Sequence, residues 1–291
     1  MTVERVALCW TEPGEVHGRF MDSVLQLIYA DKNAVVTGER AHECVIGHTF
    51  TESGPRIGHA RNSLVRSFLT KESWSEVEWL LMIDADMIFT PDALEHIFDG
   101  VRSEEGKIVR PLVGGLCFGG GSGTIIPTMY RFVDPDTNDG SAVMVVNAWA
   151  EDEIVEVDAT GAAFLLMHRG VLESMKSSYP EPCPWFAESV YKTQEFGEDW
   201  TFCMRARQLG FPIYVDTRVK IGHMKPVNLN EEMYRTGSAG LKSISAFADT
   251  QRPRVGREIT RASEVPPVIL RAAVLNRQAR RAHLQKSGKR S

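Results

Sequence analysis

The sequence predicts an α/β fold with a mostly parallel central sheet that is flanked by helices, and a smaller antiparallel part in its second half. Short apolar runs alternate with helical periodicity through the first hundred residues, which is typical of a parallel sheet covered on both faces. The run 79–83 is continuously apolar, as expected of a strand buried on both faces. After residue 127, several short strand-like runs are separated by turn residues, which favours an antiparallel arrangement there.

The first half of the chain alternates predicted strands with predicted helices. A buried strand over 3–10 ends in a turn at 11–14, and apolar residues at helical spacing predict a helix over 18–30. The next elements are a strand over 44–50, a helix from 57 to 69, the strand over 79–83, and a helix that begins with Thr90 as its N-cap and Pro91 as its first residue.

The second half contains more, shorter strands. Strands are predicted over 108–117, 127–133, 143–148, 154–157, 162–167 and 211–215, and helices over 169–176 and 200–209, the latter with Gly210 as its C-cap. The glycine-rich run 119–123 lacks the Lys-Ser/Thr pair that completes a phosphate-binding P-loop. We therefore expect a mobile loop or a plain linker there.

Charge is distributed unevenly along the chain. Residues 249–291 hold 11 lysine and arginine residues against 3 acidic ones, a net charge of +8, which leaves −13 for the rest. This predicts a domain over 1–248 and a basic, partly helical or disordered tail over 249–291. An acidic body argues against a nucleic-acid-binding core, whose footprint would be basic. The tail has three interpretations: a solvated end, contact with an acidic partner, or peripheral contact with an anionic membrane.

Two further features concern the compartment. No apolar run is long enough to span a bilayer, and no basic segment followed by an apolar one marks a leader, so we expect a cytoplasmic protein. The five cysteines include no CxxC pair, which argues against a zinc site or a disulfide framework.

Asp84 and Asp86 follow the apolar run 79–83 directly. Open α/β sheets bind ligands at the carboxyl ends of their strands, and the two acids would lie there. Carboxylates this close repel each other unless a cation lies between them, and Mg²⁺ or Mn²⁺ suits oxygen ligands and phosphates. The alternative is a polar turn that caps the next helix. The position after a buried strand favours a metal site.

Two later motifs add ionisable groups. Glu198 and Asp199 begin a predicted helix, where the helix dipole keeps a carboxylate ionised and able to act as a general base; ordinary helix capping is the alternative. His223 follows Gly222 after a predicted strand, and Lys225 comes two residues later. An imidazole that completes a metal site beside an ammonium group that pairs with phosphate is one interpretation; a structural histidine is the other.

The order and spacing of these motifs resemble the GT-A glycosyltransferases, especially family 2 and its bacterial and phage-encoded relatives. The resemblance covers about residues 3–226 and rests on Ala60-Arg61-Asn62, the run 78–87 around Asp84-Ala85-Asp86, the run 157–164, Gly197-Glu198-Asp199, and Gly222-His223. It implies a Rossmann-like GT-A fold and a metal-dependent transferase of the hexosyltransferase type. Such an enzyme moves a sugar from a UDP- or GDP-sugar to a hydroxyl group of a glycan, protein or small molecule, with inversion.

The resemblance implies roles on the donor side. Thr11 would lie beside the nucleotide base, and Arg61 would face the nucleotide. Gly161 and Ala162 would line the sugar pocket, where a larger side chain would intrude. Lys225 would neutralise the leaving diphosphate.

The resemblance also implies a metal site and a base. Asp84, Asp86 and His223 would hold Mn²⁺ or Mg²⁺, with Asp84 also near the ribose and Asp86 near the diphosphate. Asp199 would be the catalytic base, and Glu198 would bind the acceptor or share that role.

Several points stay open from sequence. Trp185, Phe186 and Trp200 either offer apolar faces to a sugar ring or pack in the core. The run 11–14 lacks the nucleotide-contacting residues of the best-known family-2 members, and the chain lacks the membrane helices of the processive synthases. A retaining GT-A transferase, a sugar nucleotidyltransferase and a non-catalytic nucleotide-sugar-binding domain are the alternative functions.

Overall fold

The computed structural model describes residues 4–38, 42–45, 50–52, 56–121, 124–138, 140–191 and 194–225. Backbone contacts divide the chain into a unit of residues 1–227 and a unit of residues 228–291. The second unit lies entirely outside the described residues. The predicted boundary between residues 248 and 249, and the predicted basic tail, therefore fall outside the described part of the chain.

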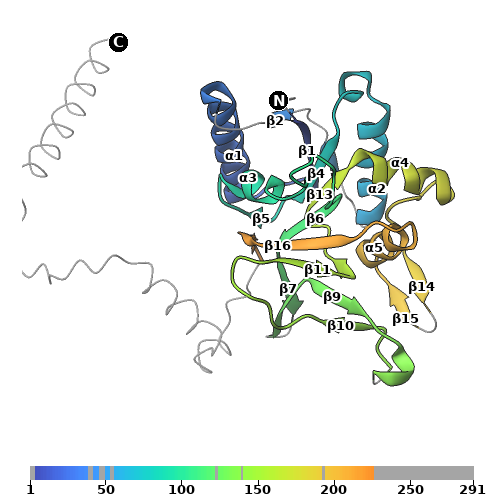
Figure 1. The fold of residues 1–291 in the computed structure, drawn as a ribbon. Helices are drawn as coiled ribbons and strands as arrows, with labels where there is room; N and C mark the ends of the chain where they lie inside the picture. Colours follow the sequence, from blue (N-terminus) through green and yellow to red (C-terminus); the bar gives the residue numbers. More distant parts are fainter. Residues whose placement is uncertain are drawn as a thin grey trace, which may run out of the picture. The chain divides into compact units, whose positions relative to one another are not determined.

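A central sheet of eight strands organises the first unit (Figure 1). Its order is β11-β16-β6-β13-β4-β1-β2, and β3 also pairs with β1. The strands are β1 (Glu4–Glu12), β2 (His42–Val45), β3 (Phe50–Glu52), β4 (Trp79–Asp84), β6 (Leu112–Leu116), β11 (Ile154–Val157), β13 (Phe164–His168) and β16 (Ile213–Lys220). Strands β11 and β13 run antiparallel to their neighbours, and the other pairs are parallel. The fold is therefore mixed α/β, with the mostly parallel sheet that the sequence predicts.

Helices cover both faces of this sheet. They are α1 (Gly18–Thr37), α2 (Ile57–Thr70), α3 (Ala93–Phe98), α4 (Arg169–Ser178) and α5 (Glu198–Gln208), with short 3-10 helices at Glu72–Trp74 and Pro135–Thr137. Helix α1 ends at Gly38, whose φ of 74° is left-handed and favours glycine. Helix α3 begins later than predicted: Asp92 is its N-cap, and Thr90 and Pro91 precede it in a turn.

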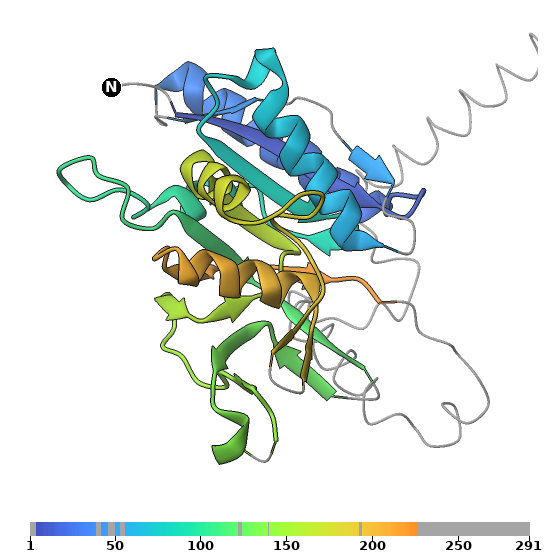
Figure 2. The same ribbon diagram turned by 90° about the vertical axis from the view of Figure 1, so that its right-hand side faces the viewer.

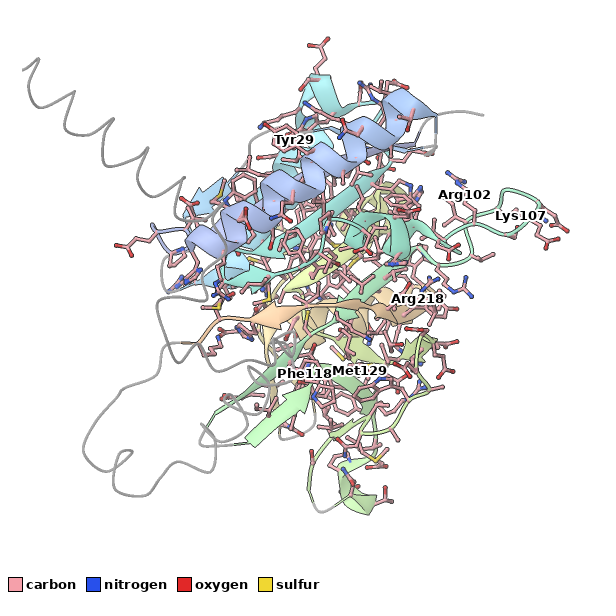
Figure 3. The ribbon with its side chains drawn as sticks, turned by 90° about the vertical axis from the view of Figure 1, so that its left-hand side faces the viewer. Tyr29, Arg102, Lys107, Phe118, Met129 and Arg218 are labelled. Carbon is pink, nitrogen blue, oxygen red and sulfur yellow. The ribbon has the colours of Figure 1, made fainter. Side chains whose placement is uncertain are left out.

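Alternation along the strands divides the core into two layers. Val6 and Leu8 of β1 pack with α1 and α3 on one face, whereas Ala7 and Cys9 pack with α2, α4 and α5 on the other. This period of two is the ordinary consequence of strand geometry. Figure 2 shows the face that carries α2, α4 and α5, and Figure 3 shows α1 lying across the opposite face, where its Tyr29 points outward. Each fully buried large apolar side chain stabilises the fold by about 1.5–3 kcal/mol.

The antiparallel part consists of small pairings beyond the β16–β11 edge and beside the carboxyl ends of the strands. The three-stranded sheet has the order β10-β9-β12, and the two-stranded pairs are β14–β15, β17–β5 and β7–β8. These strands are β5 (Met87–Ile88), β7 (Phe118–Gly121), β8 (Thr124–Pro127), β9 (Met129–Phe132), β10 (Val143–Val145), β12 (Ala159–Thr160), β14 (Ser189–Tyr191), β15 (Gln194–Phe196) and β17 (Gly222–His223).

Three predictions about elements need correction. The glycine-rich run at 119–123 was expected to be a loop or linker, but residues 119–121 lie in β7 and pair with β8, because glycine keeps the backbone N–H and carbonyl groups that form an antiparallel ladder. Strand 154–157 was expected in the small antiparallel part, but it joins the edge of the central sheet beside β16. The predicted strand over 44–50 is two strands, β2 and β3, which both pair with β1.

No helix among the described residues combines the length and the apolar character that a bilayer span requires.

Candidate functional site

The site begins where β1 and β4 end side by side. The two strands are parallel, and their register pairs Thr11 with Asp84. The Thr11 hydroxyl donates to Oδ1 of Asp84 at 2.9 Å, and the backbone N–H of Ala85 donates to the Thr11 carbonyl oxygen at 3.1 Å. The acid that follows the apolar strand is therefore held at the carboxyl edge of the sheet, where ligands bind in open α/β folds.

Arg61 joins two acids that are far apart in the sequence. Its Nη2 donates to both carboxylate oxygens of Asp84, at 2.9 and 2.8 Å, and its Nη1 donates to Oε1 of Glu198 at 2.5 Å. The side chain of Arg61 is only 4 % exposed, against 18 % for Asp84 and 20 % for Glu198. The start of α5 is thereby tied to the end of β4 through one guanidinium of α2.

The two carboxylates compensate for the burial of this cation. Burial alone lowers the pKa of Arg61, but the charges of Asp84 and Glu198 outweigh it and the pKa is raised. A buried ion pair contributes little net stability compared with apolar packing, yet removal of one partner costs about 3–5 kcal/mol. The two ion pairs of Arg61 therefore serve mainly to fix the position of Asp84 relative to the start of α5. A contact between Arg61 and the nucleotide remains a prediction.

Asp86 and His223 meet through a pairing of two short strands. Strands β5 and β17 are antiparallel, with His223 opposite Met87. The backbone N–H of Met224 donates to the Asp86 carbonyl at 2.9 Å, and Nε2 of His223 lies 3.0 Å from Oδ2 of Asp86. The two residues predicted to share a metal ion are thus in direct contact.

The second ring nitrogen of His223 fixes the chemistry of the first. Nδ1 lies 2.8 Å from the carbonyl oxygen of Phe118, which only accepts hydrogen bonds, so Nδ1 carries a proton. Nε2 of a neutral ring would then turn a lone pair toward the Asp86 carboxylate. This contact is favourable if the ring is protonated or if a cation joins the two groups. Metal-binding histidines typically donate their other N–H to a carbonyl or carboxylate in this way.

The pKa values of the pair follow from this contact. The hydrogen bond with Asp86 raises the pKa of His223 above its ordinary value, against the opposing effect of burial. Burial would raise the pKa of Asp86, but the hydrogen bonds and charges of His223 and Lys225 outweigh it, so that the pKa is lowered. Nζ of Lys225 lies 3.5 Å from Oδ2 of Asp86 and its side chain is 57 % exposed, so this ammonium group can also reach a ligand.

Asp84 does not join Asp86 and His223 in one cluster. Within the described residues, no group of three or more histidine, cysteine or acidic side chains is arranged to hold a metal ion. Both acids nevertheless face the same region: burial raises the pKa of the Cys117 thiol, and the charges of Asp84 and Asp86 both add to that effect. The structure thus places two of the three predicted ligands together, and the third beside them but paired with Arg61.

Glu198 and Asp199 form the first turn of α5, after Gly197 as N-cap. Oδ1 of Asp199 accepts the backbone N–H of Trp200 at 2.8 Å. Burial and the neighbouring charge of Glu198 raise the pKa of Asp199, and Arg61 offsets part of that rise. Glu198 is committed to Arg61, whereas Asp199 keeps one carboxylate oxygen without a side-chain partner in the described part of the chain. The role of Asp199 as a general base remains a prediction.

Gly161 and Ala162 follow β12 and are buried. A Cβ atom at Gly161 would meet Thr128 at 3.5 Å, an ordinary van der Waals distance. The protein itself therefore leaves room for a methyl group at this position, and any need for glycine would have to come from a ligand.

Two of the three aromatic candidates belong to the core. Trp185 and Phe186 are fully buried, and Phe186 stacks on Phe202 with ring centroids 4.6 Å apart. They cannot offer a face to a sugar. Trp200 is partly exposed and contacts Tyr130 edge to face at 5.1 Å.

Asn62 is a supporting residue to which the sequence assigned no role. It is fully buried; its amide donates to the carbonyl oxygens of Gly58 and Phe186, and its Oδ1 accepts from the backbone N–H groups of Trp185 and Phe186. This fastens the 185–186 segment to α2, next to Arg61. Asn62 belongs to the run Ala60-Arg61-Asn62, but its role could not be predicted from that run, because its partners Trp185 and Phe186 lie more than a hundred residues away.

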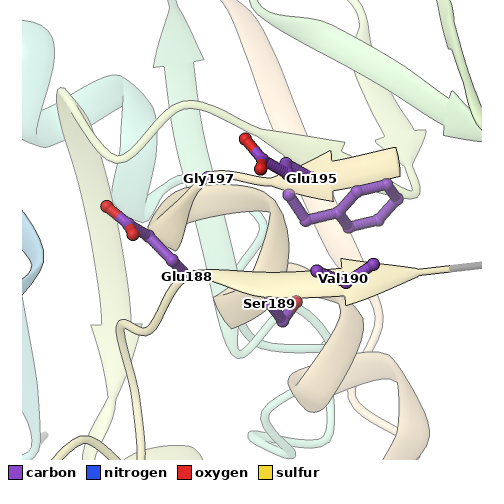
Figure 4. A pocket seen from close by; sticks show the side chains of 6 residues that line it. Glu188, Ser189, Val190, Glu195 and Gly197 are labelled. Atoms are coloured by element: carbon purple, nitrogen blue, oxygen red, sulfur yellow. The ribbon is translucent and has the colours of Figure 1, made fainter. Parts of the chain in front are cut away.

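A cavity opens beside the start of α5. It has a volume of about 490 Å³ and is lined by Glu188, Ser189, Val190, Glu195, Phe196 and Gly197. In Figure 4 the carboxyl groups of Glu188 and Glu195 extend from the β14–β15 hairpin near Gly197. The lining includes the carboxylates of Glu188 and Glu195 and reaches Gly197, the residue before the Glu198-Asp199 turn.

No protein-family model matches this sequence, and no curated protein matches it. Three solved structures superpose on parts of the chain. A197 from STIV is 16 % identical, with a TM-score of 0.43, over 76 % of this chain and 86 % of that chain. A glycosyltransferase involved in the glycosylation of the major capsid of PBCV-1 is 9 % identical, with a TM-score of 0.29, over 59 % of this chain and 62 % of that chain. The inositol-1-phosphate CTP transferase from T. maritima is 13 % identical, with a TM-score of 0.38, over 81 % of this chain and 95 % of that chain. All three scores are below 0.5, so none of these structures assigns a function to this chain.

Proposed function

We propose that this protein is a metal-dependent GT-A-type glycosyltransferase that moves a sugar from a UDP- or GDP-sugar to a hydroxyl acceptor with inversion. The observation that carries the proposal is the contact of Asp86 with His223 at the carboxyl edge of the sheet. In this contact Oδ2 of Asp86 and Nε2 of His223 lie 3.0 Å apart, and Nδ1 of His223 is hydrogen-bonded to the carbonyl oxygen of Phe118.

The residues present fit a divalent cation. Neighbouring ligands of an octahedral ion with bonds of about 2.1 Å lie about 3 Å apart, close to the observed separation of the two donor atoms. A mixed oxygen and nitrogen set suits Mn²⁺ better than Mg²⁺, which prefers oxygen alone. Asp86 and His223 would hold the ion together with phosphate oxygens of the donor. When bound, the ion stabilises the charge that develops on the leaving nucleoside diphosphate.

The chain's own residues account for the remaining chemistry. The exposed ammonium group of Lys225 lies beside the Asp86 carboxylate. It would bind the diphosphate as a second positive charge next to the metal ion. The Asp199 carboxylate would take the proton of the acceptor hydroxyl while that oxygen forms a bond to the anomeric carbon. The bond from this carbon to the diphosphate breaks at the same time, and the electron pair leaves with the nucleotide. Attack opposite the leaving group gives inversion.

The acceptor would enter over the β14–β15 hairpin, because the cavity at Glu188 and Glu195 is also lined by Gly197, the N-cap of the helix whose first turn carries Asp199. Carboxylates accept hydrogen bonds and donate none when ionised. The cavity would therefore bind an acceptor through hydroxyl or amino groups.

The test is nucleotide release from a panel of UDP- and GDP-sugars with Mn²⁺, with Mg²⁺ and with chelator. We expect release only with metal, and its loss in Asp86→Asn and Asp199→Asn. The control Glu105→Gln changes an exposed acid far from the site and should behave as wild type. Undiminished activity in Asp86→Asn contradicts the metal role, and a product of retained configuration contradicts direct displacement. Consumption of a nucleoside triphosphate with pyrophosphate release would instead indicate a nucleotidyltransferase.

A further inference from the structure

We infer that Arg61 is a positioning residue that withholds Asp84 from the cation, so that the protein supplies only Asp86 and His223 and retains the cation only while the donor diphosphate is bound. This inference rests on the proposed function and concerns the order in which that site fills and empties. It assigns a different role to each acid of the Asp84-Ala85-Asp86 motif.

The first step is the occupancy of Asp84. Nη2 of Arg61 lies within 2.9 Å of both of its oxygens, and the Thr11 hydroxyl donates to Oδ1. The negative charge of this carboxylate is thus matched by a guanidinium that never loses its proton. Asp86 is different: its side chain is 42 % exposed, and its partners, an imidazole and an exposed ammonium group, can both release it.

The second step is that Arg61 cannot easily move away. Its other arm is bound to Glu198, and its guanidinium lies 5.8 Å from the ring centroid of Phe186. Helix α2 is held close to α5 at Gly58, where a Cβ atom would come within 3.1 Å of the Glu198 Cβ. The adjacent Asn62 fixes α2 to the 185–186 segment. Release of Asp84 would leave a buried cation short of a partner, which is costly.

The third step is the place of Asp84 in the chain. It lies two residues before Asp86, at the end of β4 where the turn that carries Asp86 begins. With Asp84 held by Arg61, the protein offers a divalent ion only the Asp86 carboxylate and the neutral imidazole of His223 as ligands. Affinity in oxygen-ligand sites follows the number of charged ligands, so the ion binds weakly until a diphosphate adds its charge.

The test is direct Mn²⁺ binding, followed by electron paramagnetic resonance of the free ion, with and without UDP or GDP. In wild type we expect weak binding alone and at least tenfold tighter binding with nucleotide. In Arg61→Met we expect at least tenfold tighter binding without nucleotide, because Asp84 becomes a ligand. The double variant Arg61→Met/Asp84→Asn should return to the wild-type value, and Arg61→Lys should stay near it. Arg66→Met removes an exposed ion pair of the same helix and is the matched control.

Asp84→Asn in the wild-type background keeps Arg61 and an oxygen that can accept its hydrogen bond, so it tests ligation by Asp84 even if Arg61→Met does not fold by circular dichroism. We expect it to leave Mn²⁺ affinity without nucleotide unchanged. A tenfold loss in this variant, or no gain in a folded Arg61→Met, overturns the inference while the proposed function stands. Failure of the wild type to bind Mn²⁺ even with UDP or GDP overturns the proposed function, and the inference with it.

Discussion

The Nε2 atom of His223 lies 3.0 Å from Oδ2 of Asp86, although 137 residues separate the two in the chain. The contact exists because β16 runs parallel to β4 within one sheet, so that both strands end at the same edge. Each of them is followed by a two-residue strand, β5 after β4 and β17 after β16, and these two short strands pair. A site of this kind can bind a cation only when the imidazole has lost its second proton.

The first prediction concerns the stability of the metal-free protein against pH. The pKa of Asp86 is lowered, so its contribution is present above the ordinary value of 3.8 and is lost as pH falls through the folded value. The pKa of His223 is raised, so its contribution is present below the ordinary value of 6.5 and is lost as pH rises through the folded value. His223→Gln should therefore destabilise the protein most between these limits, by about 0.5–1 kcal/mol given solvent screening.

The measurement is urea unfolding of both proteins in chelator across the pH range. Mn²⁺ affinity of the wild type should rise over the same interval in which His223 loses its proton, because proton and metal compete for Nε2. A difference in unfolding free energy that does not change with pH would show that the pair is not ionic.

A second prediction concerns Asp199, whose pKa is raised mainly by burial. Its ionised form is therefore disfavoured in the folded state, and the protein loses stability as pH rises through the folded pKa. Asp199→Asn keeps an oxygen that can accept the Trp200 N–H, so it should be more stable than wild type near neutral pH, with a smaller difference in acid. It should lower kcat by about 10²–10⁴-fold, as expected for loss of a general base.

Glu198→Gln is the matched comparison, since both residues are acids in the first turn of α5. We expect a smaller loss of kcat in Glu198→Gln, because Glu198 is bound to Arg61 and would only help to position the start of α5. Thermal unfolding at several pH values and steady-state kinetics check both variants. Equal losses of kcat would mean that the two acids share the role of base.

The sequence predicted the elements that depend on local pattern. The apolar run before Asp84 is β4, and the periodicity of Leu64, Val65 and Phe68 is helix α2. The same spacing places Arg61 on the apolar face of α2, three and four residues before Leu64 and Val65. A charged residue there signals a buried ion pair, but its partners Asp84 and Glu198 lie 23 and 137 residues away, and no local pattern identifies them.

Other features could not be derived because they depend on pairing at long range. Strands β5 and β17 have two residues each, too few to show any periodicity. The β14–β15 hairpin, which lines the cavity next to Gly197, was not predicted either, and Phe196 is its only buried described residue. The separation of Asp84 from the pair Asp86 and His223 follows from Arg61, so the motif alone could not reveal it.

A third prediction concerns Asn62. Its amide makes four hydrogen bonds to the backbone of Gly58, Trp185 and Phe186, and none of its side chain is exposed. Asn62→Ala would remove these bonds and leave the buried backbone groups of Trp185 and Phe186 without this partner, at a cost of about 2–4 kcal/mol. Urea unfolding measures the loss. Thr70→Ala removes an exposed hydroxyl bond of the same helix and should change stability by less than about 0.5 kcal/mol. Equal effects would contradict the assignment of Asn62 as the anchor.

The last prediction concerns two glycines, Gly161 and Gly115, and asks whether a methyl group at each would collide with the protein or with a bound ligand. A methyl group at Gly161 would meet Thr128 at an ordinary 3.5 Å, whereas one at Gly115 would come within 2.8 Å of Ile221 Cγ1. Gly115→Ala should therefore lose about 1–3 kcal/mol of stability through overpacking. Gly161→Ala should change it by less than about 1 kcal/mol. If Gly161 lines the sugar pocket, its variant should nevertheless raise the KM for the nucleotide-sugar about tenfold, a loss of about 1.4 kcal/mol in binding. Chemical unfolding and donor titration measure the two effects separately. An unchanged KM in Gly161→Ala would place the donor sugar elsewhere.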